Sequence, residues 1–139
     1  MLGWFLMAEK YIIKSNMRIP IVNEQDNLLY FKDKSERDKR KEITRSSSLI
    51  IFNEKGEVLL AKRSKNKKNS PNVWGPSAEG SLEEGDTYES NAIKEAEEEI
   101  GIKLDNVIIG PKRRESDNYH EYFIQCFFAT ISSSTKFTL

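Results

Sequence analysis

The segment from residue 86 to residue 101 specifies a helix that is marked at both ends. Asp86 is a good N-cap residue, and Glu89, three residues further on, completes an Asp-x-x-Glu capping box. Gly101 stands just past the last helical position, where a left-handed backbone favours glycine. Four apolar residues recur between these ends at helical spacing: Ala92, Ile93, Ala96 and Ile100. The pattern predicts a helix over residues 87–100 with one buried stripe.

Three carboxylates border that stripe. Glu95, Glu98 and Glu99 fall within one helical turn, where like charges repel each other. A hard divalent cation would offset this repulsion, because Mg²⁺ prefers carboxylate and phosphate oxygens. The alternative is a solvated acidic helix face, which binds nothing. The spacing and the marked helix ends favour a metal site.

Strands are expected on both sides of this helix, so the chain predicts a mixed α/β fold. Two hairpins precede it, Ile19–Val22 with Leu28–Phe31 and Ser46–Phe52 with Glu57–Lys62. The second hairpin turns at Asn53–Gly56, where Gly56 can adopt a positive φ. Val73–Ala78 is a short or edge strand because Gly75 and Pro76 interrupt it. Asn106–Arg114 and Tyr119–Ile131 are expected as strands after the helix.

Length and charge limit the classes of function. The chain has 139 residues, which suits an N-terminal extension over residues 1–16 and one domain over 17–139. Its 22 basic and 22 acidic residues give no basic excess, which argues against binding a nucleic-acid polymer. The charges are segregated instead, with basic residues at 62–68 and acidic ones at 83–99. A small phosphate-rich ligand with a metal ion would suit both regions.

The chain offers no disulfide and no membrane anchor. Its one cysteine, Cys126, lies in an apolar run and is expected to be buried in a reducing cytosol, which indicates a cytoplasmic protein. The apolar residues 1–7 are too few to span a membrane, and they lack the features of a signal peptide. No membrane partner is therefore expected, whereas a homodimer stays open.

The stretch from Gly80 to Ile102 resembles the Nudix box, Gly-x5-Glu-x7-Arg-Glu-U-x-Glu-Glu-x-Gly-U, where U is aliphatic. The matching residues are Gly80, Glu95, Glu98, Glu99, Gly101 and Ile102, with Ala96 as a small apolar residue at the first U. Asp86 stands where Glu is usual, and Lys94 stands where Arg is usual. The flanking segments Arg45–Arg63 and Asn72–Ser77 are similar to the hairpin and the tryptophan-bearing segment that precede the box.

The resemblance implies a three-layer α/β/α sandwich that hydrolyses a nucleoside diphosphate linked to another group. It implies that Glu95, Glu98 and Glu99 bind Mg²⁺ or Mn²⁺, and that Glu98 or Glu99 acts as general base. Many relatives use a further acid outside the box, and three candidates stay unassigned here: Glu115, Asp117 and Glu121. The C-terminal helix of the sandwich has no counterpart before residue 139, so a truncated chain is considered.

Two other functions compete with hydrolysis. The chain looks most like the Nudix branch that includes isopentenyl-diphosphate isomerase, whose chemistry needs a cysteine just before the box glycine and metal-binding histidines. Residues 77–81 contain neither, and His120 is the only histidine, which argues against isomerase activity. A non-catalytic nucleotide-binding module is the remaining alternative.

The substrate is not specified by the sequence, but a few contacts are suggested. Arg63 ends a strand beside the basic loop and is a candidate phosphate contact, together with Lys65. Trp74 and Tyr119 could stack on a base, but aromatic side chains usually pack inside, so both are predicted in the core.

Overall fold

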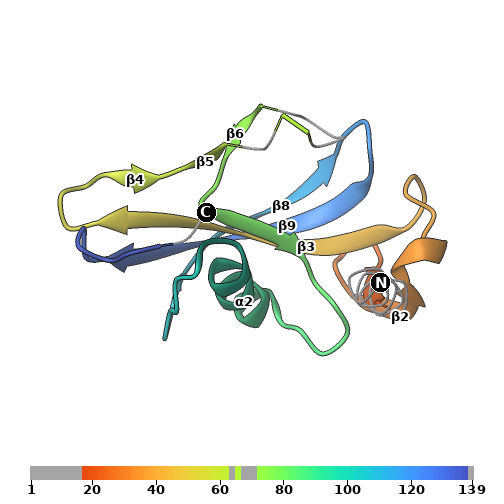
Figure 1. Cartoon of the computed structure of the whole chain (residues 1–139). Helices are drawn as coiled ribbons and strands as arrows, with labels where there is room; N and C mark the ends of the chain where they lie inside the picture. The colour runs from red at the N-terminus through yellow and green to blue at the C-terminus, as the bar shows by residue number, and fades with distance from the viewer. Residues whose placement is uncertain (1–16, 63–64, 67–71, 138–139) are drawn as a thin grey trace, which may run out of the picture.

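The structure is a computed structural model that describes residues 17–62, 65–66 and 72–137. A mixed sheet of seven of the described strands has the order β2-β1-β3-β9-β8, with β4 and β7 both paired to β3 (Figure 1). Its strands are β1 (Arg18–Val22), β2 (Leu28–Asp33), β3 (Ile43–Asn53), β4 (Val58–Leu59), β7 (Ala78–Ser81), β8 (Ile108–Ser116) and β9 (Glu121–Ile131). The other elements are the 3-10 turn η1 (Lys34–Glu36), the helix α2 (Tyr88–Ile100) and a separate pair of short strands, β5 (Ala61–Lys62) and β6 (Trp74–Gly75). The predicted α/β class with a mixed sheet is confirmed.

The two longest strands form the centre of the sheet. β3 and β9 run parallel from the pair Ile43–Glu121 to the pair Asn53–Ile131, whereas the other pairs are antiparallel. Parallel neighbours need a long crossover connection, and the chain between them contains α2. Cys126 is buried in β9, as predicted. No described helix is long and apolar enough to cross a membrane, and the extension predicted over residues 1–16 lies outside the described residues.

Both predicted hairpins are present. β1 pairs with β2, and β3 pairs with β4 around a turn in which Gly56 has φ 77°. The first turn places Asp26 at φ 61°, a left-handed conformation that aspartate tolerates better than most residues. Its carboxylate accepts hydrogen bonds from Arg45 Nε, Tyr88 Oη and Lys112 Nζ, each at 2.8 Å. These bonds fasten the first hairpin to β3, α2 and β8.

The helix α2 ends as predicted but begins one residue later. Gly101 has φ 69° and its N–H donates to the carbonyls of Ala96 and Glu97. The N-cap is Thr87 rather than Asp86, because Thr87 and Ser90 bond reciprocally through their side chains and backbone N–H groups. The capping box predicted with Glu89 is therefore wrong. Asp86 is instead engaged by a cation, described below.

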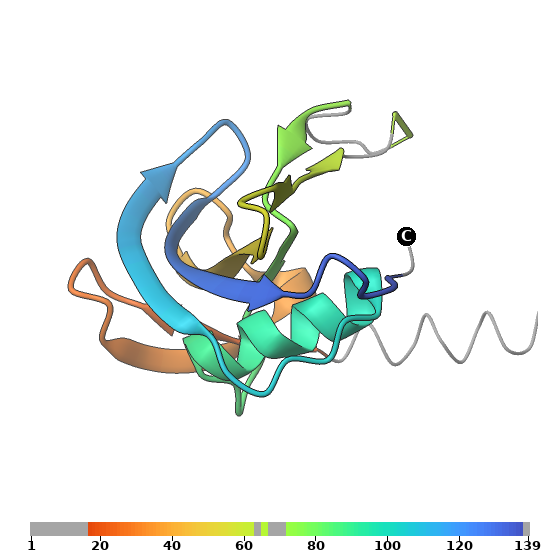
Figure 2. The same cartoon turned by 90° about the vertical axis from the view of Figure 1, so that its left-hand side faces the viewer.

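One face of α2 packs on β3, β7 and β9 (Figure 2). Ala92, Ala96 and Ile100 are buried as predicted, and they join a core cluster that also contains Leu49, Ile51, Ala78, Ile102, Phe127 and Ala129. Ile93 is only half-buried. Asn91, which the apolar pattern did not include, is fully buried at 0% exposure.

The short strands β5 and β6 lie on the side of the sheet opposite α2 (Figures 1 and 2). Trp74 of β6 is 62% exposed, with the ammonium of Lys62 5.7 Å from the centre of its ring. Tyr119, in the turn between β8 and β9, is 40% exposed. Both aromatic residues were predicted in the core, and the structure contradicts this. The reason is that each belongs to an element that stands apart from the layer between α2 and the sheet.

Candidate active site

The carboxylate of Glu95 lies directly against Gly80, the first residue of the box. A Cβ atom at position 80 would lie 2.3 Å from the Glu95 Cδ, which no side chain could tolerate without displacing the carboxylate. Gly80 is on β7, paired with Ser47 of β3, and Glu95 projects from the middle of α2. The glycine therefore makes the space in which the helix places its first candidate ligand. The fixed interval between these two residues in the motif thus corresponds to a contact.

The Glu95 carboxyl group is hydrogen-bonded to Glu99. Burial raises the pKa of Glu95 to about 7, and a hydrogen bond with Glu99 and the charges of Glu99 and Glu98 act in the same direction. The charge of Lys94 opposes this rise in the pKa only partly. Near neutral pH the Glu95 carboxyl group is thus partly protonated, and a cation bound beside it would displace that proton. Glu98 and Glu99 are exposed, so this end of the pair is open to solvent.

The donor set fits a hard divalent cation. Carboxylate oxygens that repel one another, one of them in a space that a Cβ would fill, are the ligand chemistry of Mg²⁺ or Mn²⁺. Across residues 17–62, 65–66 and 72–137, however, no three acidic, histidine or cysteine side chains are gathered into a complete metal-binding group. The pair Glu95–Glu99 is the assembled part, and Glu98 acts on it through its charge.

The two residues that depart from the box pattern contact each other. Lys94 Nζ donates to Asp86 Oδ2 at 2.7 Å, and the same oxygen accepts from the backbone N–H of Glu83 at 2.8 Å. Burial works to lower the pKa of Lys94, but the hydrogen bond and charge of Asp86, with Glu83 and Glu98, raise it above its ordinary value. The shorter acid and the lysine thus form an ion pair that ties the loop before α2 to the helix.

Asn91 is a site residue that the sequence did not reveal. Its Nδ2 donates to the Gly80 carbonyl at 2.8 Å, one helical turn before Glu95. Its Oδ1 is buried and has no hydrogen-bond partner among the described residues. The side chain holds the backbone of β7 at the glycine that receives Glu95. A polar residue at the edge of an apolar stripe was the only signal for this role.

The predicted substrate contacts are only partly described. Arg63 lies outside the described residues, and Lys65 is an exposed turn residue. The three candidate acids outside the box already have partners: Glu115 pairs with Arg113, Asp117 contacts His120, and Glu121 pairs with Arg114. Their part in catalysis stays unassigned.

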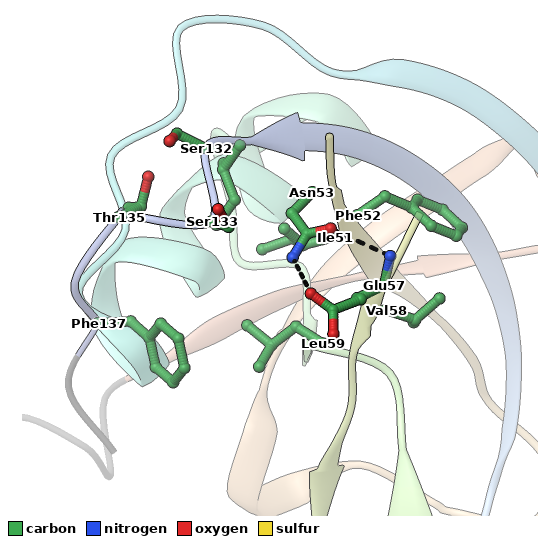
Figure 3. A pocket seen from close by; sticks show the side chains of 11 residues that line it. Ile51, Phe52, Asn53, Glu57, Val58, Leu59, Ser132, Ser133, Thr135 and Phe137 are labelled. Carbon is green, nitrogen blue, oxygen red and sulfur yellow. Dashed lines mark hydrogen bonds between the residues drawn. The ribbon is translucent and has the colours of Figure 1, made fainter. Parts of the chain in front are cut away.

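A small cavity of about 130 Å³ lies elsewhere, between the β3–β4 hairpin and residues 132–137 (Figure 3). Ile51, Leu59 and Phe137 are among its apolar lining residues, and the Asn53 side chain donates to Glu57 at its rim. Glu54 fastens residues 132–137 by accepting from both the backbone N–H and the hydroxyl of Ser133. None of the three box glutamates lines this cavity, so it is separate from the candidate active site.

Comparison with known proteins places this geometry in a family. The model of the NUDIX domain matches residues 42–136, which include β3, the whole box and β9. The chain belongs to the Nudix domain family. The glycine–glutamate contact and the acidic helix are therefore the Nudix box in its folded form.

Sequence relatives include both hydrolases and isomerases. An uncharacterised Nudix hydrolase of Listeria monocytogenes is 41% identical over 82 residues, which are 59% of this chain and 47% of that protein. An isopentenyl-diphosphate Delta-isomerase of Corynebacterium diphtheriae is 38% identical over 61 residues, which are 44% of this chain and 33% of that protein. The chain spans about half the length of the curated Nudix hydrolase that it matches in Listeria monocytogenes.

Solved structures agree on the fold. A crystal structure from Deinococcus radiodurans superimposes with a TM-score of 0.68 at 22% identity, covering 87% of this chain and 76% of that chain. A Caenorhabditis elegans Ap4A hydrolase complex gives a TM-score of 0.56 at 18% identity, covering 70% and 72%. At these identities the likeness establishes the shared fold alone.

Proposed function

We propose that this Nudix protein is a metal-dependent hydrolase that cleaves the diphosphate bond of a nucleoside diphosphate linked to another group. The observation that supports it most is the Glu95 carboxyl group, which lies against Gly80 and is hydrogen-bonded to Glu99. Such an arrangement stabilises the folded chain poorly by itself, because it buries one acid beside another. A bound cation would turn the same arrangement into a favourable one.

In this proposal Glu95, Glu98 and Glu99 hold Mg²⁺ or Mn²⁺. The cation would neutralise the charge of the diphosphate and favour deprotonation of a water molecule. Glu98 or Glu99 would accept the proton of the attacking water, since both are exposed and thus accessible. As the water oxygen bonds to phosphorus, the bond from phosphorus to the bridging oxygen breaks, and the second phosphate leaves with that oxygen. The Asp86–Lys94 pair would fix the loop that leads into the helix.

Isomerisation of isopentenyl diphosphate is not favoured, although isomerases are among the relatives. Ser77 occupies the neighbourhood just before the box glycine, and its hydroxyl is already engaged: it donates to the Leu59 carbonyl and accepts from the Ile51 N–H. This buried serine links β7 to the second hairpin and offers no thiol for proton transfer. The only histidine, His120, lies in the β8–β9 turn.

One assay tests the proposal. The full chain is incubated with a panel of nucleotide-linked diphosphates, with Mg²⁺ or with chelator, and release of phosphate or nucleoside monophosphate is measured. Hydrolysis is expected with metal only, and Glu98→Gln and Glu99→Gln are expected to abolish it. Glu97→Gln is the matched control, because Glu97 is exposed on the same turn and its only described ion pair is with Lys103. Nucleotide binding without turnover on any substrate would instead identify a non-catalytic binding module.

A further inference from the structure

Arg37 carries a half-buried charge that has no ion-pair partner in the described part of the chain. Its Nη1 donates to the Thr44 hydroxyl at 3.3 Å, and its Nε is buried with no hydrogen-bond partner among residues 17–62, 65–66 and 72–137. A guanidinium cannot lose its charge in a protein, so the cost of burying it must be met by an acceptor. A neutral hydroxyl meets only a small part of that cost.

The carboxylates near Arg37 are already engaged. Glu42 accepts from Tyr30 Oη, Lys32 Nζ and the backbone N–H of Asp38. Asp117 accepts from the backbone N–H groups of two residues of its own turn, Tyr119 and His120. Neither acid forms an ion pair with Arg37 among the described residues, although the charge of Glu42 partly opposes the effect of burial on the Arg37 pKa. An acceptor from outside these residues would offset the rest of the cost.

Two other cations, Lys39 and Arg40, lie near the same β8–β9 turn. Arg40 Nη1 donates to the Asp117 carbonyl at 2.8 Å, which holds a second cation beside the β8–β9 turn. Burial lowers the pKa of His120, and the charges of Arg37 and Lys39 lower it further against the opposing charge of Asp117. Glu121 opposes these cations as Asp117 does, so cations and acids are mixed at the start of β3.

The partner of Arg37, Thr44, belongs to a row of small polar side chains on β3. Thr44 pairs with Tyr122 in the parallel register, and the Tyr122 ring stacks on His120 at 4.4 Å. Side chains alternate along β3, so Thr44 shares a face with Ser46 and Ser48, opposite to the face that carries Leu49 against α2. A row of small hydroxyl-bearing residues thus begins at Arg37 on the face that α2 does not cover.

We propose that Arg37, together with Thr44, forms a binding site for a phosphate group. A phosphate offers several oxygens to the planar guanidinium fork, and its charge would offset the burial of a guanidinium that has no ion pair among the described residues. Arg37 lies before the matched Nudix residues 42–136, so family membership does not assign it this role. Two sources of this phosphate are distinguished below: free inorganic phosphate, and a phosphorylated end of the substrate, which rests on the proposed hydrolase function.

A phosphate titration tests the site without any catalysis. The full chain is titrated with inorganic phosphate and with pyrophosphate at neutral pH, in the absence of divalent metal, while the Arg37 side-chain Nε–H resonance is followed by NMR. Saturable movement of that resonance is expected, and Arg37→Gln should weaken binding roughly tenfold or more, because a hydrogen bond to a charged group is lost. Arg113→Gln is the control of equal charge change, since Arg113 is exposed and paired with Glu115. No saturable binding, or equal weakening in both variants, would overturn the proposal.

Two further variants test the site in case Arg37→Gln does not fold. Arg37→Lys keeps the charge but loses the fork, so an intermediate affinity is expected. Thr44→Val removes the hydroxyl with little change of shape and should weaken binding, but less than Arg37→Gln does, because only a neutral hydrogen-bonding group is lost. If Arg37→Gln does not fold, a wild-type affinity in Arg37→Lys counts against the site, because a point charge would then suffice.

The source of the phosphate is separated by kinetics on the same diphosphate panel. An increase in KM for Arg37→Gln with little change in kcat identifies a phosphate of the substrate as the occupant. An unchanged KM with loss of phosphate binding identifies free phosphate. If the wild-type chain shows no turnover, the hydrolase proposal fails, whereas the titration still decides the fate of the Arg37 site.

Discussion

Lys94 and Asp86 are bonded to each other at 2.7 Å, and they are the two positions at which this chain departs from the Nudix box pattern. The lysine side chain is 30% exposed and the aspartate 17%, so the pair is only partly screened by solvent. At each position this chain has a residue of the same charge as the one usual in the box, aspartate for glutamate and lysine for arginine. The attraction is therefore kept while the geometry changes. The bond joins the loop that follows β7 to the second turn of α2.

A double-mutant cycle should measure this pairing. We expect Asp86→Ala and Lys94→Ala each to lower the free energy of unfolding, and the cycle to give a coupling of about 1 kcal/mol, as befits a partly buried ion pair. Urea unfolding of the two single variants and the double variant measures it. The paired replacement Asp86→Glu with Lys94→Arg restores the usual residues and should keep the coupling. Strictly additive single effects would show that the bond contributes nothing.

Gly80→Ala should disable the metal site while leaving the fold in place. The added Cβ would lie 2.3 Å from Glu95 Cδ, and the end of a flexible side chain can move away at small cost to stability. We expect Mn²⁺ affinity, measured by calorimetry, to fall roughly tenfold or more because a ligand has lost its position. Gly75→Ala is the control, because nothing lies within 4 Å of its added Cβ. Equal Mn²⁺ affinities in the two variants would contradict a ligand role for Glu95.

The helix and its carboxylates were predictable because their signals are local. Gly101, the apolar stripe and the interval from Gly80 to Glu95 all follow from residue type and spacing. The predicted N-cap was wrong because Asp86 and Thr87 are both good capping residues. The choice between them depended on Lys94, eight positions after Asp86, which pairs with it. Sequence alone does not tell which of two adjacent caps will find a better partner.

The errors and omissions elsewhere have tertiary causes. Trp74 and Tyr119 were predicted in the core on the basis of their residue type, but burial depends on whether other elements enclose them. Asn91 was missed because a polar residue on a helix is usually solvated, and only the approach of β7 turns it into a buried contact. The lack of an ion-pair partner for Arg37 among the described residues likewise could be recognised only from the structure, which shows the partners of Glu42 and Asp117.

Two variants at Asn91 should separate the contribution of its hydrogen bond to the free energy of unfolding from the contribution of its size. Asn91→Asp replaces the donor to the Gly80 carbonyl with a buried acid, whereas Asn91→Leu removes both polar atoms. Loss of the donor should lower the free energy of unfolding by about 2 kcal/mol in either variant. The aspartate variant should regain stability at low pH, because a protonated carboxyl can donate to the carbonyl again, whereas the leucine variant should not. Denaturant unfolding at pH 4 and pH 7 makes the comparison, and identical pH responses would contradict the assigned bond.

Glu42 should make the stability of the protein fall in acid. Burial works to raise the pKa of Glu42, but the hydrogen bonds from Tyr30 and Asp38 and the contact with Lys32 outweigh it and hold the pKa at about 2, below the ordinary 4.5. Because the folded state binds the proton less tightly than the unfolded state, this contribution is fully present above pH 4.5 and is lost as the pH falls towards 2. Glu42→Gln should therefore be less stable than wild type at pH 7, and the difference should shrink steadily through this window. Glu36→Gln, at an exposed position of the nearby 3-10 turn, provides the comparison and should track the wild type throughout. A constant gap between wild type and Glu42→Gln from pH 7 to pH 2 would mean that the carboxylate acts through packing rather than charge.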